Sequence, residues 1–228
     1  MTASPAAILL PVTMSLGQGE PAAGPWRVES VAGLVQLLLD AAGEPPDRPR
    51  IVAVDGRSAG GKTTLAELLH RAAPSSAVVH IDHLSWNSCF FGWADLLAHW
   101  VLEPLHRGQT VRYRPPAWQE HSREGAIEVS AGLDLVLVEG VGAARSELMH
   151  LIDAVVRVQS DATQAKRRGI ARDGGDAAAA GFWHEWMAEE LPFLAAQRPW
   201  ERATVVVAGT PRLAHDRATH MVLAEPVS

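Results

Sequence analysis

Cysteine is almost missing from this sequence, since Cys89 is the only one among 228 residues. A single cysteine excludes an intramolecular disulfide and a cysteine-based zinc cluster, and such usage is typical of the reducing cytoplasm. The ten histidines show neither H-E-x-x-H nor another zinc spacing, so we expect no zinc site. We therefore expect a cytoplasmic protein that folds around an apolar core.

The sequence also lacks an excess of positive charge and a long hydrophobic run. Its formal net charge is −6, which gives no reason to expect nucleic acid or an anionic membrane as a partner. The apolar patch AAILLPVTM, residues 6–14, is interrupted by Pro11 and follows no basic residue. We therefore expect neither a membrane span nor a signal peptide.

Hydrophobic residues make up 47% of the chain and charged residues 20%, which is the composition of a globular domain. Residues 1–25 mix Ala, Pro, Gly and Ser without sustained periodicity, so we expect a flexible N-terminal tail. Residues 26–228 are expected to form one domain, with a small helical lid at about 161–176.

Short β-branched apolar runs alternate with segments of helical periodicity along the chain. The runs predict strands at 50–55, 77–82, 110–114, 133–140, 153–159 and 203–209. Helices are predicted at 28–42, 63–73, 92–107, 162–175 and 181–197, with Pro192 as a kink. This alternation favours an α/β layer fold around a parallel sheet.

One glycine-rich segment carries the strongest functional signal. It fits G-x-x-x-x-G-K-[ST], follows a predicted strand and opens a predicted helix, which is the context of a P-loop. Its residues are Gly56, Arg57, Ser58, Ala59, Gly60, Gly61, Lys62, Thr63 and Thr64. Backbone N–H groups and the helix N-terminus would cradle phosphates, with Lys62 at the β- and γ-phosphates and Thr63 on Mg²⁺.

Other interpretations of this loop are weaker. An ordinary glycine turn remains open, whereas the dinucleotide pattern G-x-G-x-x-G is not supplied by Arg57 and Ser58. A GTPase would usually carry a guanine-reading N-K-x-D, but Asn87 is the only asparagine and Ser88 follows it. The fold class predicted is thus the three-layer α/β sandwich of P-loop NTPases.

Two acids follow predicted strands and should meet the loop in one crevice, because ligands of open parallel sheets bind beyond the carboxyl ends of the strands. Glu139 follows the apolar run 135–138 and is expected to hold Mg²⁺. Asp82 ends the strand 77–82 and is expected to accept the proton of an attacking hydroxyl and to help orient Mg²⁺. A strand-capping acid and a solvated turn acid are the alternatives.

A late basic helix completes the expected donor site. It offers Lys166, Arg167, Arg168 and Arg172. Arginines on a mobile lid can close over phosphates and neutralise charge in the transition state, so Arg168 and Arg172 are the expected catalytic arginines. The alternative is a solvated helix face.

Together these pieces resemble the uridine kinase-like family, which includes phosphoribulokinase and pantothenate kinase. The matching segments are VAVDGRSAGGKTTLA, VHIDHL, HSRE, LVLVEGVGAARSEL, RGIARDG, WHEWMAEE and VVVAGTP, in the family's order, over roughly residues 50–210. The resemblance implies ATP-dependent phosphorylation of a hydroxyl with Asp82 as the catalytic base, and a homodimer, since this fold often dimerises in the family.

One segment departs from the family pattern. Uridine kinases carry Tyr-Asp-Phe-x-x-His-Ser-Arg, whereas this chain has PAWQEHSR at 116–123, with Pro116 and Ala117 in place of the tyrosine and aspartate. The missing hydrogen-bonding groups favour an acceptor other than uridine. The acceptor pocket is expected to involve Asp82, Trp86, Arg114, Trp118 and His121.

The sequence therefore predicts an ATP- and Mg²⁺-dependent kinase that phosphorylates a hydroxyl of a nucleoside-like or related small molecule. A phosphotransferase of antibiotics or other secondary metabolites remains an alternative within enzymes. A nucleotide-binding regulatory protein without an acceptor is the alternative outside them.

Overall fold

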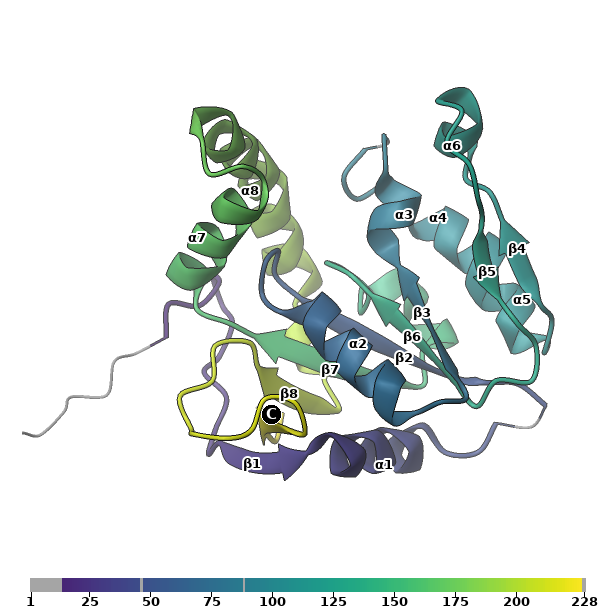
Figure 1. The fold of residues 1–228 in the computed structure, drawn as a ribbon, viewed down its shortest axis with the longest axis horizontal. Helices are drawn as coiled ribbons and strands as arrows, with labels where there is room; N and C mark the ends of the chain where they lie inside the picture. Colours follow the sequence, from purple (N-terminus) through teal and green to yellow (C-terminus); the bar gives the residue numbers. More distant parts are fainter. Residues whose placement is uncertain (1–13, 46, 88, 227–228) are drawn as a thin grey trace, which may run out of the picture.

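A computed structural model describes residues 14–45, 47–87 and 89–226 of the chain. Its centre is a seven-stranded sheet in the order β1-β9-β8-β7-β2-β6-β3 (Figure 1). The strands are β1 (Arg27–Ser30), β2 (Arg50–Gly56), β3 (Ser76–His80), β6 (Leu135–Glu139), β7 (Ala154–Gln159), β8 (Val205–Ala208) and β9 (His220–Ala224). Five neighbouring strands pair in parallel, in the order β3, β6, β2, β7 and β8. Strands β9 and β1 then continue the sheet with antiparallel pairing.

Helices cover both faces of this sheet, because its central strands are apolar on both sides. In β2, Ile51 and Ala53 join one core, whereas Val52 and Val54 join the other. The helices α1 (Val31–Ala42) and α2 (Lys62–Ala72) pack on the second core. The opposite face carries α3 (Ile81–Ser85), α4 (Ala94–Leu97), η1 (Ala98–Leu102), α5 (Glu103–His106) and η2 (Ser146–Leu151).

Two appendages rise from the carboxyl end of the sheet (Figure 1). One is the antiparallel pair β4 (Val111–Tyr113) and β5 (Ile127–Val129) with α6 (Pro116–Glu120) between them. The other holds α7 (Ala162–Arg172) and α8 (Ala177–Gln197), followed by η3 (Pro199–Arg202). The close packing of α7 on α8 depends on Gly169, since a Cβ there would lie 2.0 Å from the Trp183 ring.

Several predicted elements need correction. The helix predicted at 28–42 begins only at Val31, because residues 27–30 form β1 against β9. The strand at 203–209 is followed by a further strand, β9, and β5 was not predicted. The helix α8 continues through Pro192, and Asp82 lies in the first turn of α3 rather than at a strand end.

The predicted tail falls in two parts. Residues 1–13 lie outside the described residues, whereas residues 14–25 pack against the sheet instead of extending freely. Glu20 is buried and its carboxylate pairs with Arg157 at 2.9 Å and with Arg57 at 3.4 Å. Gln159 accepts a hydrogen bond from the Ala23 amide. A buried acid needs partners of opposite charge, and these partners hold the segment in place.

Candidate active site

The glycine-rich segment forms a tight loop between β2 and α2. Ala59 and Gly61 adopt positive φ angles of 54° and 105°. Glycine at position 61 adopts such an angle without steric cost. Gly56 must lack a side chain, because a Cβ would lie 2.7 Å from the Val158 carbonyl oxygen. No side chain caps the N-terminus of α2, so its amides and the positive end of the helix dipole are free to meet an anion.

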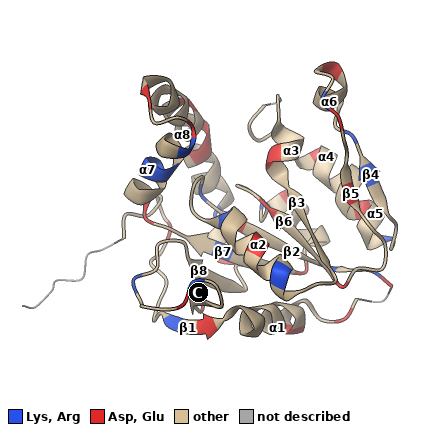
Figure 2. Ribbon diagram, in the orientation of Figure 1, with Lys and Arg blue, Asp and Glu red and all other residues tan. Residues whose placement is uncertain are grey.

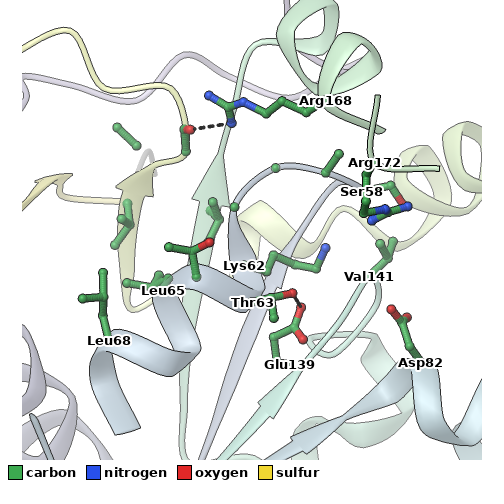
Figure 3. Close-up of a pocket in the computed structure, with 18 of the residues that line it drawn as sticks. Ser58, Lys62, Thr63, Leu65, Leu68, Asp82, Glu139, Val141, Arg168 and Arg172 are labelled. Atoms are coloured by element: carbon green, nitrogen blue, oxygen red, sulfur yellow. Dashed lines mark hydrogen bonds between the residues drawn. The ribbon is translucent and has the colours of Figure 1, made fainter. Parts of the chain in front are cut away.

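The first residues of α2 aim polar groups at the same place (Figure 3). Lys62 is buried, and its Nζ donates a hydrogen bond to the Arg57 carbonyl at 3.1 Å. The Thr63 hydroxyl donates to Glu139 Oε1 at 3.3 Å. The hydroxyl and carboxylate oxygens thus converge beside a buried ammonium group, as the sequence predicts.

Glu139 has a second partner that the sequence analysis missed. His80, the last residue of β3, sits beside the end of β6, and its Nδ1 lies 2.9 Å from Glu139 Oε2. Burial raises the pKa of Glu139, but the hydrogen bond with His80 and the charge of Lys62 lower it more, so the net pKa is below the usual value. The same hydrogen bond raises the pKa of His80. Glu139 is therefore held as a carboxylate.

A cavity of about 970 Å³ surrounds these groups. Leu65 and Leu68 lie at one end of the view in Figure 3 and Asp82 at the other, with Lys62 and Glu139 between them. Further lining comes from the segment after β8, including Pro211, His215 and Met221, and from α7 and α8. This volume is at the upper end of the range for small-molecule sites.

The predicted lid, about 161–176, corresponds to α7 and the turn that precedes α8, and Figure 2 shows α7 as a basic element. Arg168 and Arg172 both line the cavity. Arg168 Nη1 donates to the Gly209 carbonyl at 3.0 Å, and Arg172 pairs with the neighbouring Asp173 at 2.8 Å. The two arginines thus border the cavity from α7.

The expected acceptor residues are not all brought to this cavity. Asp82 lines it, whereas Trp86, Arg114, Trp118 and His121 are absent from its lining. Trp118 is buried and donates its indole N–H to the His83 carbonyl at 2.8 Å, so it acts in packing. Arg114 donates to the Arg123 carbonyl at 2.7 Å on the β4–β5 appendage. Trp86 packs edge-on against the exposed His121.

Side chains that were not expected there line the cavity or contact the phosphate loop instead of those four. Phe90, Phe182 and Trp186 line the same cavity as Asp82. Glu190 of α8 is fully buried, and its Oε1 accepts a hydrogen bond from the Ser58 amide at 3.1 Å. Trp186 and Glu190 lie within the family-like segment WHEWMAEE, but no sequence motif marks Phe90 or Phe182 as residues of this site.

No group of three or more His, Cys, Asp or Glu residues within the described part of the chain could hold a metal ion by itself.

Among the comparisons with known proteins, the comparison with solved structures found matches. No family model matches the chain, and no curated protein matches it. A protein from Silicibacter sp. TM1040, provisionally described as a fructose transport system kinase, superposes with a TM-score of 0.53 at 19% identity, over 77% of this chain and 95% of that chain. This chain shares its fold. The predicted fold class, a P-loop α/β sandwich with a mostly parallel sheet, is thereby confirmed.

A second protein, provisionally described as a uridine kinase from Bacillus stearothermophilus, gives a TM-score of 0.47 at 20% identity, over 77% of this chain and 96% of that chain.

Among the described residues, no helix is both long enough and apolar enough to cross a bilayer.

Proposed function

We propose that the protein is an ATP-dependent kinase that transfers the γ-phosphoryl group to a hydroxyl of a small molecule. One observation carries the proposal: an uncapped phosphate loop, a buried lysine and the carboxylates of Glu139 and Asp82 border a single cavity. A protein that only binds nucleotide has no use for a free acid beside the loop, whereas phosphoryl transfer to an alcohol needs one.

The cavity favours one direction for the two substrates. The end of the cavity with Leu65 and Leu68 would suit a nucleobase, and the loop amides and Lys62 would suit the triphosphate (Figure 3). Asp82, beyond the end of the phosphates, would accept the proton of the attacking hydroxyl. Arg168 and Arg172 would offset the charge that develops on the transferred group, acting from the lid.

The donor set near the loop fits Mg²⁺, which prefers oxygen ligands and one or two carboxylates beside substrate phosphates. Thr63 Oγ1 and Glu139 Oε1, 3.3 Å apart, are the oxygens that would hold it, with Asp82 as a further candidate. When bound, the ion would neutralise charge on the phosphates.

The decisive experiment measures ADP release from ATP and Mg²⁺ over a panel of nucleosides, sugars, pantothenate-like alcohols and aryl alcohols. We expect at least one acceptor to raise ADP release well above the basal hydrolysis rate, because a positioned base and acceptor convert a slow hydrolysis into a transfer. Tight ATP binding with no acceptor that stimulates ADP release would instead identify a regulatory nucleotide-binding protein.

The hydrogen bond between His80 and Glu139 gives a separate prediction. Replacing His80 by Ala should raise the Mg²⁺ concentration needed for half-maximal ADP release by about 10-fold or more, because partners that orient a ligating carboxylate typically contribute 10- to 100-fold. His99, which is exposed on η1, provides the matched control, and His99→Ala should leave the Mg²⁺ requirement unchanged. An unaltered Mg²⁺ requirement in His80→Ala would show that Glu139 does not depend on this contact.

A further inference from the structure

Three aromatic side chains form one wall of the cavity, named here the aromatic wall: Phe90, Phe182 and Trp186. Phe90 lies between α3 and α4, whereas the other two project from α8. The centroids of the Phe90 and Trp186 rings are 4.6 Å apart, and those of Phe90 and Phe182 are 6.3 Å apart in an edge-to-face arrangement. Rings at these distances attract one another, so the wall is a continuous surface built from two elements.

This wall is open to the cavity rather than sealed within a core. Phe182 is 46% exposed, and Phe90 and Trp186 are half-buried. A large apolar side chain left this exposed beside a cavity is a common sign of a binding site. Asp82 borders the same cavity, so a molecule that rests on the wall can present a group to the proposed base.

Trp186 is fixed in position by a buried carboxylate. Its indole Nε1 donates a hydrogen bond to Glu190 Oε2, and Glu190 also accepts from the Ser58 amide at 3.1 Å. One acid, fully buried, therefore connects the aromatic wall to the phosphate loop. A buried acid that accepts two hydrogen bonds holds its donors in one geometry, so the wall keeps a constant position relative to the phosphates.

The hydrogen-bonding capacity of the wall then decides which acceptor it suits. Phenylalanine offers no donor or acceptor, and the only N–H of Trp186 is already given to Glu190. A planar ring stacks on this surface by its face, so the wall binds the ring without hydrogen bonds to its edge and does not require a polar edge. A hydrocarbon or indole ring loses nothing there and gains stacking.

We propose that the acceptor is an aryl alcohol, a molecule whose phenyl or indolyl ring packs on the aromatic wall while its hydroxyl reaches Asp82. The inference rests on the proposed kinase function and narrows its substrate class away from nucleosides and sugars. In the transfer, the hydroxyl oxygen bonds to the γ-phosphorus, the bond from that phosphorus to the bridging oxygen of ADP breaks, and the hydroxyl proton passes to Asp82.

The test uses matched alcohols that differ in the ring. Phenylethanol and cyclohexylethanol have the same chain and similar size, but only the first is planar. We expect kcat/KM for ADP release to be about tenfold higher with phenylethanol than with cyclohexylethanol or uridine. Phe182→Ala should reduce this preference to about twofold or less and leave KM for ATP unchanged. Because the side chain of Phe182 is exposed, we expect the variant to fold.

Trp100→Leu is the matched control, because Trp100 is 50% exposed and stacks on Tyr113 outside the cavity. Its ring preference should equal that of the unmodified protein. A nucleoside or sugar that outperforms the aryl alcohols, or a preference that survives in Phe182→Ala, would overturn the inference and leave the kinase proposal standing. Absence of both ATP binding and ADP release with every acceptor would instead remove the kinase proposal itself.

If ATP binds and no panel member is phosphorylated, saturation-transfer NMR of phenylethanol decides the matter. Transfer to its ring protons that disappears in Phe182→Ala supports the aromatic wall as a binding surface. No transfer to the ring in the unmodified protein overturns the inference.

Discussion

Replacing Asp82 by asparagine is expected to lower acceptor-dependent turnover by about 10²–10⁴-fold, the usual contribution of a positioned general base. Asparagine keeps the size of the side chain but cannot take up the hydroxyl proton. ATP affinity should stay within about twofold, because the triphosphate is held by the loop amides and Lys62. The measurement is the steady-state rate of ADP release with the best acceptor, together with ATP binding by titration.

Asp95 offers a matched control for this change. It lies in the first turn of α4, as Asp82 lies in the first turn of α3, and it is exposed and absent from the cavity lining. Asp95→Asn should retain full turnover. Near-normal turnover in Asp82→Asn, with the acceptor confirmed as product, would show that another group takes the proton.

The donor half of the site could be predicted from the sequence because its signals are local. The phosphate loop and the residues that it positions are consecutive, from Gly56 to Thr64, and the strand that ends at Glu139 begins with a short run of four buried apolar residues. Parallel pairing then brings the ends of β2 and β6 together, so the carboxylate and Thr63 meet without any further information.

The rest of the fold depends on contacts that no local pattern encodes. The edge strand β1 pairs with β9 across nearly the whole chain, Arg27 with Leu223. The strand at 27–30 is short and continues directly into α1. Val28 therefore lies at helical spacing from Val31 and Val35, and the strand was predicted as part of the helix. Similarly, Ile81 extends the apolar run of β3 in sequence, so the strand was predicted to reach residue 82, although the backbone turns into α3 at Ile81.

Of the residues expected to bind the acceptor, only Asp82 lines the cavity, for a related reason. His121 matches a family segment in sequence and Trp118 replaces its phenylalanine, but the lining of the cavity includes neither residue, because they lie on or beside α6 between β4 and β5. The aromatic wall instead combines Phe90 with residues about ninety positions later, on α8. Aromatic residues on a helix usually pack in a core. Trp186 therefore looks like a packing residue although it lies in the segment WHEWMAEE, and no pattern marks Phe182.

Replacing Arg157 by methionine should destabilise the fold by about 3–5 kcal/mol, the usual result of removing one partner from a buried ion pair. The guanidinium is 1% exposed and bridges two buried carboxylates, at 2.7 Å from Asp55 and 2.9 Å from Glu20. Methionine fills a similar volume but leaves both carboxylates without their main counter-charge. Urea unfolding at neutral pH measures the loss, and Arg27→Met, which removes an exposed pair with Glu225, should change stability by less than about 1 kcal/mol.

The pH dependence of this loss separates charge from packing. Burial raises the pKa of Glu20, but the charge and hydrogen bonds of Arg157 lower it more, so its net pKa lies below the usual value. A carboxyl with a lowered pKa in the folded state stabilises the protein above its unfolded pKa, about 4.3, and that stabilisation disappears as the pH falls through the folded pKa. Without Arg157, burial dominates and protonation of Glu20 favours folding instead. The stability difference between the two proteins should therefore shrink as the pH is lowered below about 4, whereas a difference that stays constant would mean that Arg157 acts through its volume alone.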